Sequence, residues 1–580
     1  MKKRVISLLL AVCLFVGLLA SCEAKTYTVT FETNGGTTVN ALSLTEGEPL
    51  PMPSVPTKEG YTFDGWYADA AFAEAYVFGK MPAKDITLYA KWKTPDDAKK
   101  PDTSKQPLLG DRGEDGSWNS VDFKGQEVRV AISVDADEDA IFPAADIYTM
   151  GPDVAGANAV SKEVLARNAR AKEALGITVT YIPKDLSCDK IHEDIRTIVQ
   201  TSARNSPDIY NNDMYGLARA MVDGLLWNVK NPGKDVKSYI DLGAEGWYAD
   251  FTKGMTFDQN KLYLFAGDYF IDVLRMAWVV YVNNDILTAN LEKMPGWCKS
   301  IDDFYENVEY GFWDLDALAD VAERVFVDSG ASGVTEKTDT TVGFAMNEAT
   351  ARIISAASGV TLYYQDEGAG LVPKTLASAD TLQQVSNKYK AMTETKGVYY
   401  EEDVKSSTTC FLQGNFLFAM GRIGDMESGA MRDFMPSRGI VPVPKWNANE
   451  QEDYRTVVDE RAEVGCILNT AGAYSAASAF LQFLNEESGN VIYTYYEKAL
   501  KYKYIDDQNA RTMMDLVRES IASPFGFCIG NLCETLYTGM GSLKGLRIED
   551  NATLSSTFAS EKDAYKDCLD QMIAKFATFS

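Results

Sequence analysis

Residues 160–182 read VSKEVLARNARAKEALGITVTYI and predict a helix that leads directly into a strand. Val164 and Leu175 fall on one apolar face of this helix. Gly176 follows them at the position where a helix C-terminus favours positive φ. Apolar and β-branched residues then fill 177–182, which is typical of a strand.

The same alternation of helix and strand continues along the chain on both sides of this stretch. Short strands are predicted at 128–132, 177–182 and 207–210, and helices at about 158–175, at 189–201 and from Met214. A second block of this kind follows Tyr281. Strands that alternate with helices predict an α/β fold built on parallel sheets.

The amino-acid composition excludes several classes of function. The chain has 580 residues, 46% of them apolar, which is enough for several domains that each bury a core. Its formal charge of −27 disfavours nucleic acid as a partner, because phosphates require a basic face. The single histidine, His192, excludes histidine-rich zinc sites, the facial iron triad and H-E-x-x-H proteolysis. We expect His192 to be exposed and to have no specific role.

No catalytic residue, metal site or cofactor is predicted. The acidic run that starts at Asp135 has the first spacings of a calcium loop, but Ala140 replaces the required glycine. Seven cysteines remain beyond residue 22, and Cys528 and Cys533 are the only close pair. This pair is predicted either to form one local disulfide or to remain as buried free thiols.

The first residues predict a lipid-anchored protein on the extracellular face of the cell membrane. Three basic residues at 2–4 precede an apolar run at 5–20 that is too short to span a membrane. The run ends in LASC, which resembles a bacterial lipobox. The resemblance implies that 1–21 is a signal peptide and that lipidated Cys22 begins a short tether at 22–26. The alternative is an ordinary signal peptide with an incidental cysteine.

Residues 27–93 predict a small β-rich module. Strands are expected at 27–31, 60–67 and 86–92, with Asn34-Gly35-Gly36 as a turn after the first. The turn, the run GYTFDGWY and the closing LYAKW resemble the Listeria–Bacteroides repeat family, also called the internalin B-repeat, which implies a β-grasp-like fold. Such a module is either a passive spacer or a contact surface, and Trp66 and Trp92 are expected in its core. A Pro-, Asp- and Lys-rich linker is predicted at 94–120.

A second resemblance covers most of the remaining chain. The stretches that carry it lie at 168–177, 207–210, 279–287, 313–318, 411–418, 439–445, 496–501 and 513–516. In this order they resemble extracellular solute-binding proteins of ABC importers, in the carbohydrate-binding branch. The resemblance implies a type II periplasmic-binding-protein-like fold for 121–580. Lobe 1 would comprise residues 121–277 and 460–490, lobe 2 would comprise residues 278–459, and residues 491–580 would form C-terminal helices.

The resemblance also implies a mechanism without bond making or breaking. Ligands of open α/β sheets bind beyond the carboxyl ends of the strands. A small solute, which the resemblance to this branch implies is a sugar, would bridge the two lobes and stabilise a closed form that the permease subunits of an ABC importer recognise.

Candidate ligand-binding residues follow the predicted strands. Asn212, Asp213 and Tyr215 follow the strand at 207–210 and offer hydrogen-bonding groups and a ring to a sugar. Alternatively, Asn212 and Asp213 cap the helix that begins at Met214. Asp268 and Tyr269 follow a predicted strand at 262–266.

Arg422 follows a predicted strand at 416–420, at a position where sugar binders of the family often have an aromatic residue. A guanidinium there suits an anionic ligand, or it pairs with one of the abundant acids. Four tryptophans are expected either to stack on a sugar or to lie in the core: Trp227, Trp247, Trp278 and Trp313.

Two other functions compete with solute binding. A surface glycoside hydrolase needs only two carboxylates and no histidine. A glycan-binding adhesin would depend on the repeat at 27–93.

Overall fold

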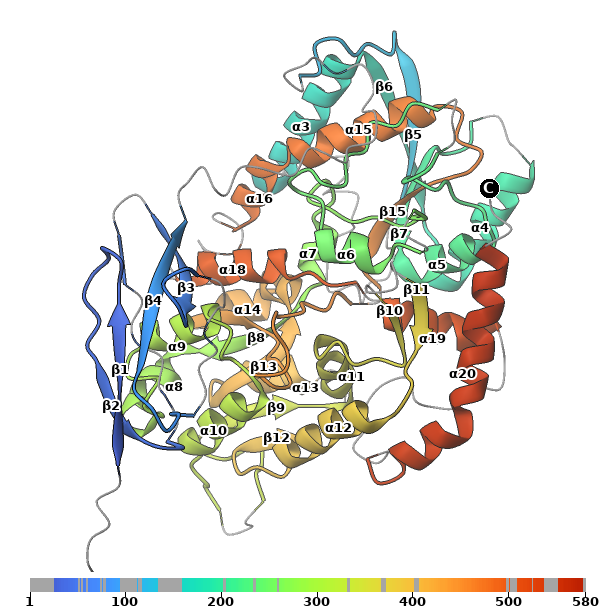
Figure 1. Ribbon diagram of the computed structural model, residues 1–580. Coiled ribbons are helices and arrows are strands. Elements are labelled where there is room, and N and C mark those ends of the chain that lie inside the picture. The colour runs from blue at the N-terminus through green and yellow to red at the C-terminus, as the bar shows by residue number, and fades with distance from the viewer. Residues whose placement is uncertain are drawn as a thin grey trace, which may run out of the picture. The chain divides into compact units, whose positions relative to one another are not determined.

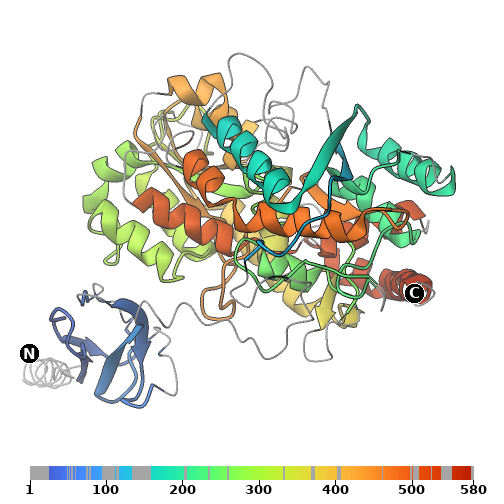
Figure 2. The same ribbon diagram turned by 90° about the horizontal axis from the view of Figure 1, so that it is seen from above.

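The computed structural model describes most of the chain, in two compact units at 1–103 and 104–580 (Figures 1 and 2). The described residues are 25–93 without 49, 51–52, 54–55, 59–60, 73–75 and 77–79, then 112, 117–133, 159–201, 205–232, 236–257, 260–330, 334–366, 372–400, 406–434, 436–459, 461–496, 500, 509–523, 525–536 and 551–576. The predicted signal peptide, Cys22 and the acidic run from Asp135 lie outside these residues.

The first unit contains a four-stranded sheet. Its strands are β1 (Thr26–Glu32), β2 (Leu42–Thr45), β3 (Thr62–Tyr67) and β4 (Ile86–Lys93), in the order β2-β1-β4-β3. The three predicted strands are confirmed, and β2 is a fourth that sequence reasoning missed. Trp66 is buried against Phe31, with 5.0 Å between ring centroids, as expected for a core residue. Trp92 is half-buried and donates a hydrogen bond to the carbonyl of Thr33 at 2.9 Å.

The predicted turn at Asn34-Gly35-Gly36 is confirmed. Asn34 and Gly35 have φ values of 50° and 89°, which asparagine and glycine tolerate best. A Cβ on Gly36 would lie 2.3 Å from the Trp92 ring, so the third residue must also be glycine. The side chain of Asn34 donates to the carbonyl of Ala90 at 2.7 Å and fixes the turn against β4.

In the second unit, lobe 1 is built on a sheet with the order β15-β7-β5-β6. The strands are β5 (Gln126–Ser133), β6 (Ile177–Lys184), β7 (Ile209–Asp213) and β15 (Glu463–Ile467). The covering helices are α3 (Ala159–Leu175), α4 (Cys188–Thr201), α5 (Met214–Val222) and α15 (Tyr474–Glu486). Figures 1 and 2 show α3 and α15 side by side along the sheet. Gly176 has a φ of +60°, as predicted, where α3 leads into β6.

Lobe 2 is built on a sheet with the order β12-β9-β13-β8-β14. Its strands are β8 (Trp278–Asn283), β9 (Val342–Met346), β12 (Val398–Tyr400), β13 (Phe416–Arg422) and β14 (Arg438–Pro442). The predicted α/β class is therefore confirmed. The expected parallel pairing is present between β5 and β6, β5 and β7, β9 and β12, and β9 and β13. The sheets are nevertheless mixed, because β8 runs antiparallel to β13 and β14, and β15 runs antiparallel to β7. β8 and β15 are the strands that follow the two crossings between lobes.

The remaining elements surround these two sheets. Between β7 and β9 they are α6 (Ala249–Gly254), α7 (Asp272–Arg275), α8 (Asn284–Ala289), η3 (Leu291–Lys293), α9 (Ile301–Glu309) and α10 (Leu315–Val325). After β9 they are α11 (Glu348–Ala357), β10 (Tyr363–Asp366), β11 (Val372–Thr375), α12 (Asp380–Thr393), α13 (Ser406–Phe411), η4 (Ile423–Glu427) and α14 (Gly429–Asp433). After α15 they are α16 (Gly489–Thr494), α18 (Asn509–Glu519), α19 (Phe525–Leu536) and α20 (Leu554–Phe576).

Two segments that run between the lobes lie side by side, at 276–278 and 457–459. We call them the crossover ribbon. The amide of Trp278 donates to the carbonyl of Val457, and the amide of Asp459 donates to the carbonyl of Met276, both at 2.9 Å. The chain therefore enters and leaves lobe 2 through two segments that are hydrogen-bonded to each other.

The prediction of a strand at 262–266 is wrong. The segment is buried, but it joins no ladder and makes only an isolated antiparallel bridge, between Phe265 and Gly465 of β15. Its apolar run reflects burial in the core rather than regular pairing.

Two contacts of the C-terminal helices show that two predictions were wrong. A disulfide joins Cys533 of α19 to Cys568 of α20, so the predicted local disulfide between Cys528 and Cys533 is wrong, and Cys528 is buried. His192 is only 8% exposed, and its Nε2 lies 2.7 Å from Asp223 Oδ2. Lys575 of α20 also binds Asp223, at 2.6 Å, and His192 therefore belongs to a polar cluster that holds α20.

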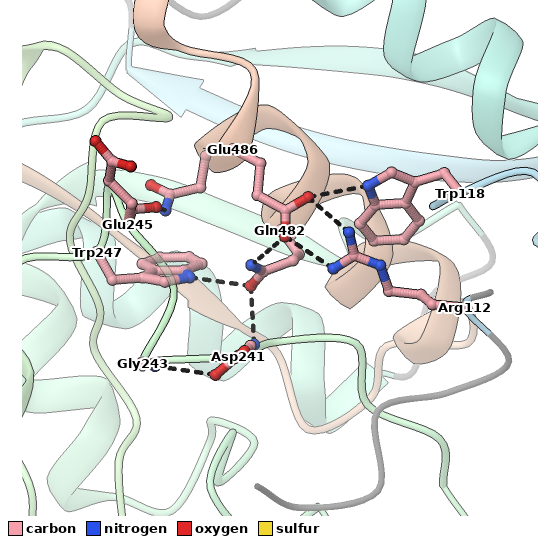
Figure 3. Close-up of polar contacts among 9 residues, drawn as sticks. Arg112, Trp118, Asp241, Gly243, Glu245, Trp247, Gln482 and Glu486 are labelled. Atoms are coloured by element: carbon pink, nitrogen blue, oxygen red, sulfur yellow. Dashed lines mark hydrogen bonds and ion pairs between the residues drawn. The ribbon is translucent and has the colours of Figure 1, made fainter. Parts of the chain in front are cut away.

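The start of the second unit is clamped to α15 (Figure 3). Arg112 makes two hydrogen bonds to the Glu486 carboxylate, at 2.8 and 3.0 Å, and its guanidinium lies 4.2 Å from the centre of the Trp118 ring. Trp118 Nε1 donates to the same carboxylate at 3.0 Å. Gln482 positions Glu486 with a 2.9 Å hydrogen bond and accepts from Trp247 Nε1 at 3.0 Å.

A search of the described residues for a helix with the length and apolarity needed to cross a membrane found none.

Candidate functional site

Asp213 ends β7 and caps α5. Its Oδ1 accepts hydrogen bonds from the amides of Tyr215 and Gly216, at 2.8 and 3.3 Å. The capping alternative is therefore confirmed for Asp213, whereas buried Asn212 accepts from the amide of Asp213 itself at 2.8 Å. Burial raises the pKa of Asp213 to about 7, against the opposing effect of the two capping amides.

Arg422 ends β13 in lobe 2, opposite Trp278 of β8. Its guanidinium lies 3.2 Å from Asp425 Oδ1 and 3.7 Å from Asp459 Oδ2. The alternative that Arg422 pairs with acids is confirmed, although its partners are partly buried rather than surface residues. With two carboxylates beside it, the guanidinium is largely neutralised.

The crossover ribbon brings Asp213 and Arg422 towards a common partner. Asp459, which belongs to the ribbon, pairs with Arg422 and also raises the pKa of Asp213 by charge repulsion. Asp213 comes from the lobe 1 sheet and Arg422 from the lobe 2 sheet. We call Asp213, Arg422, Asp425 and Asp459 the ribbon site.

A buried ion pair links the segments on the two sides of the ribbon site. Arg275 of α7 makes two hydrogen bonds to Glu427 of η4, through Nε at 2.8 Å and a terminal nitrogen at 3.1 Å. Asp272 lies 3.2 Å from the same guanidinium, and Tyr495 donates to Glu427 at 2.8 Å. Arg275 is 0% exposed, so this pair is part of the core where the lobes join.

The structure places Asp268 and Tyr269 in the interior of lobe 1. Asp268 is 6% exposed, accepts from the Tyr248 hydroxyl at 3.0 Å and pairs with Arg518 of α18 at 3.3 Å. Burial raises the pKa of Asp268 to about 6. The carbonyl of Tyr269 accepts a 2.9 Å hydrogen bond from buried Arg167. These contacts bring neither residue into the ribbon site.

The remaining aromatic candidates are divided between core and partial exposure. Trp313 and Trp247 are buried, and Trp227 and Trp278 are half-buried. The Tyr215 ring is half-buried and lies 5.5 Å from the Arg219 guanidinium. Trp278 is the tryptophan that lies in the ribbon, next to Arg422 in the sheet register.

Sequence reasoning missed a cavity of about 810 Å³ that none of the six predicted ligand-binding residues lines. Its walls come from α6, from the end of α11 and β10, from the loop at 446–457 and from the segment at 522–526. A signal was available, because an acidic run with Trp446 and Tyr454 follows the recognised stretch at 439–445. Only the fold shows that this run faces the other three segments.

The shifted pKa of Asp213 predicts a pH dependence of stability. Between about pH 4 and pH 7 the folded protein keeps a proton on Asp213 that the unfolded chain has lost, so the free energy of unfolding falls as pH rises through this window. Asp213→Asn retains a capping oxygen and removes the titration, so its stability should fall less over this window than that of the wild type. Urea unfolding at pH 4.5, 6 and 7.5 measures the difference; equal pH slopes for both proteins would contradict the assignment.

Among the described residues, no group of three or more His, Cys, Asp or Glu side chains is arranged to hold a metal ion.

Comparisons with solved structures concern the larger part of the chain. The extracellular solute-binding protein from Staphylococcus aureus in complex with maltose aligns over 78% of this chain and 97% of its own, with 11% identity and a TM-score of 0.45. The galacto-N-biose-/lacto-N-biose I-binding protein of the ABC transporter from Bifidobacterium longum aligns over 79% and 99%, with 12% identity and a TM-score of 0.44.

Comparisons by sequence concern the N-terminal module. A putative Gly-rich membrane protein of Evansella cellulosilytica is 43% identical over 76 residues, which are 13% of this chain and 9% of that protein. Internalin H of Listeria monocytogenes is 39% identical over 80 residues, 13% of this chain and 14% of internalin H. The match thus spans only a small part of these relatives. The model of the Listeria-Bacteroides repeat domain matches residues 27–91, which confirms the repeat predicted from the sequence.

Proposed function

We propose that this protein is a solute-binding lipoprotein of the extracellular membrane face that captures a sugar between its two lobes and delivers it to an ABC importer. The observation that carries the proposal is the ribbon site, where Arg422 from the lobe 2 sheet pairs with Asp459 of the crossover ribbon, and the charge of Asp459 also acts on Asp213 from the lobe 1 sheet. A solute that contacts both strand ends favours one arrangement of the lobes. The membrane anchor at Cys22 is supported by the sequence pattern of residues 1–22 alone.

The charges at the ribbon site favour an uncharged solute. Asp425 and Asp459 already neutralise Arg422, so an anionic ligand would have to displace a carboxylate or lie beside it. Sugar hydroxyl groups both donate and accept hydrogen bonds, and they fit a site that contains carboxylates and a guanidinium. We therefore propose a neutral sugar rather than a sialic or uronic acid.

Domain roles follow from the same proposal. Residues 121–580 would form the solute-binding domain, with the lobe boundaries predicted from the sequence. The Listeria-Bacteroides repeat at 27–91 would act as a spacer beyond the tether. The linker predicted at 94–120 would join it to the binding domain, on which Arg112 and Trp118 already pack.

Binding should be visible by calorimetry and by thermal unfolding of the full chain. At a concentration 100 times Kd, a ligand raises the free energy of unfolding by about 2.7 kcal/mol and shifts Tm upward by several degrees. The panel contains uncharged oligosaccharides, sialic and uronic acids, and peptides. We expect binding of an uncharged sugar, and we expect Asp213→Ala and Arg422→Ala each to raise its Kd at least about 10-fold.

The matched control is Arg324→Ala, which removes an exposed arginine paired with Asp320. It should bind like the wild type. A response to peptides without any response to sugars would reject the carbohydrate assignment. Full binding by both ribbon-site variants would reject the location. Release of a cleaved glycan would favour the glycoside hydrolase instead.

A further inference from the structure

The helix α20 extends from lobe 1 to lobe 2 (Figure 1). It is 23 residues long, so its two ends are about 35 Å apart. Most of its buried residues follow one another at intervals of three, four or seven, which is the spacing of one helix face. They are Leu554, Phe558, Tyr565, Cys568, Leu569, Met572 and Phe576. The helix is therefore packed against the rest of the protein from end to end.

The C-terminal end of α20 is bound to lobe 1. Lys575 Nζ donates to the carboxylate of Asp223, at the end of α5, at 2.6 Å. Phe576 is buried, and its ring centroid lies 4.5 Å from that of Phe257. The carbonyl of Phe576 also accepts a 3.0 Å hydrogen bond from Lys261 Nζ. This end of the helix is thus held by an ion pair, a hydrogen bond and an aromatic contact.

Three basic side chains surround the carboxylate of Asp223. His192 Nε2 lies 2.7 Å from Oδ2, Arg196 donates to the same oxygen at 2.6 Å, and Lys575 binds Oδ1. The hydrogen bond with His192, together with those from Lys575 and Arg196, holds the pKa of Asp223 below its usual range. The anion that receives Lys575 is therefore present throughout the physiological pH range.

The N-terminal end of α20 is bound to α12 of lobe 2. The side chain of Asn551 donates to Ser386 Oγ at 2.9 Å and to Asn387 Oδ1 at 3.0 Å. Gln383 donates to the carbonyl of Asn551 at 3.0 Å and accepts from the Ser555 hydroxyl at 2.9 Å. In turn, α12 packs against α10 and α11 and contacts β12 of the lobe 2 sheet. The two ends of one helix are thus attached to different lobes.

Between its ends, α20 is covalently joined to α19. The disulfide connects Cys568 of α20 to Cys533 of α19, and α19 contacts both α5 and β10. The ring of Tyr565 lies 6.3 Å from that of Tyr363 in β10. The middle of α20 therefore cannot leave the protein surface unless α19 moves with it or the disulfide breaks.

The lobes are thus attached to each other at the crossover ribbon and, through α20, at a second place. A single flexible connection permits two domains to bend in several directions. An α-helix cannot lengthen without breaking its own backbone hydrogen bonds, so α20 with both ends attached fixes the largest distance between α5 and α12. A motion that separates α5 from α12 further requires one end of α20 to detach.

We propose that α20 is a strap that limits how far the two lobes can separate. The strap permits a rotation that keeps α5 and α12 at a constant distance, and it opposes rotations that move them apart. It therefore selects the direction of hinge bending as well as its range. The inference goes beyond the proposed function, because it concerns the motion of the chain without any solute.

Pulsed electron–electron double resonance on the full chain tests the strap, because it measures the distance between two nitroxide labels. The labels are attached to p-acetylphenylalanine placed at Gln200 of α4 and at Ala391 of α12, which are both exposed. This chemistry leaves the cysteines and the disulfide unmodified. We expect one narrow distribution of distances in the chain that carries only the labels.

One variant detaches each end of the strap. Lys575→Ala with Phe576→Ala removes the ion pair and the aromatic contact with lobe 1. Asn551→Ala with Gln383→Ala removes the four hydrogen bonds described above between the start of α20 and α12. We expect each double variant to lengthen the mean distance and to broaden the distribution.

Lys566→Ala is the matched control. Lys566 is an exposed lysine of α20 that pairs with Asp570 of the same helix, so its loss should leave the distribution unchanged. A change in either double variant with an unchanged control supports the strap. Wild-type distances in both double variants, or an equal change in the control, would overturn it.

Circular dichroism shows whether each strap variant is folded. If the variant that lacks the buried ring of Phe576 does not fold, the polar variant at the other end decides the outcome. All of these measurements are made without a solute. Their failure would therefore leave the proposed function intact, and a failure of the sugar titrations would leave the strap intact.

Discussion

Replacing Arg275 with methionine is expected to lower the free energy of unfolding by about 3–5 kcal/mol. Arg275 is completely buried, and its guanidinium makes two hydrogen bonds to Glu427 and one to Asp272. Methionine fills much of the same space but leaves two carboxylates in the core without their cation. Because Arg275 precedes the crossover ribbon and Glu427 follows β13, the loss should affect the junction of the two lobes first. Urea unfolding followed by circular dichroism measures the change.

Arg324→Met is the control for this variant. Arg324 pairs with Asp320 one helical turn away on the exposed face of α10, at 2.9 Å. Exposed pairs of this kind contribute at most about 0.5 kcal/mol, so the control should unfold almost like the wild type. Equal stabilities of the Arg275 and Arg324 variants would show that the buried pair does not hold the junction. The double variant Arg275→Met with Glu427→Leu should recover part of the loss, because it removes charge from both sides.

The second large effect should come from the disulfide between Cys533 and Cys568. The two cysteines are 35 residues apart, and closing a loop of this length in the unfolded chain stabilises the folded state by about 3–4 kcal/mol. The double variant Cys533→Ser with Cys568→Ser should lose this amount. Differential scanning calorimetry with and without dithiothreitol measures it.

The reductant supplies the internal control for the disulfide. Dithiothreitol should lower the Tm of the wild type towards that of the double variant and leave the variant itself unchanged. The thiols of Cys298, Cys410, Cys466 and Cys528 are buried, so they should not contribute to this difference. A reductant effect of equal size in both proteins would mean that the stabilisation lies elsewhere. A stable disulfide also agrees with the extracellular location predicted from the first residues.

The elements that were correctly predicted depend on local patterns. The helix-to-strand transition at Gly176 was predicted because apolar periodicity and a positive-φ glycine are properties of a few neighbouring residues. The strand predicted at 416–420 corresponds to β13. The segment at 262–266 failed because burial alone produces the same apolar run as a strand. The antiparallel direction of β8 depends on where the chain crosses between sheets, which no local pattern encodes.

The candidate site was predictable only in part. Asp213 and Arg422 were found because polar residues at strand ends stand out in the sequence. Their common partner Asp459 was not found, because it is distant in the chain from both. Asp268 looked equally promising, yet it lies in the interior, where it pairs with the half-buried Arg518 of α18. The partner of Cys533 was missed for the same reason, since the helices that bring Cys568 near it pack only in the folded chain.

The crossover ribbon makes lobe 2 an insertion with closed ends. The amide of Trp278 and the carbonyl of Val457 are 2.9 Å apart, and everything between them along the chain leaves lobe 1 and returns at the same point. The free-energy cost of holding the two ends of a loop together rises by only about 0.6 kcal/mol for each doubling of the loop's length. A peripheral helix of lobe 2 such as α14 can therefore change in length without moving the two ends of the insertion at Trp278 and Val457.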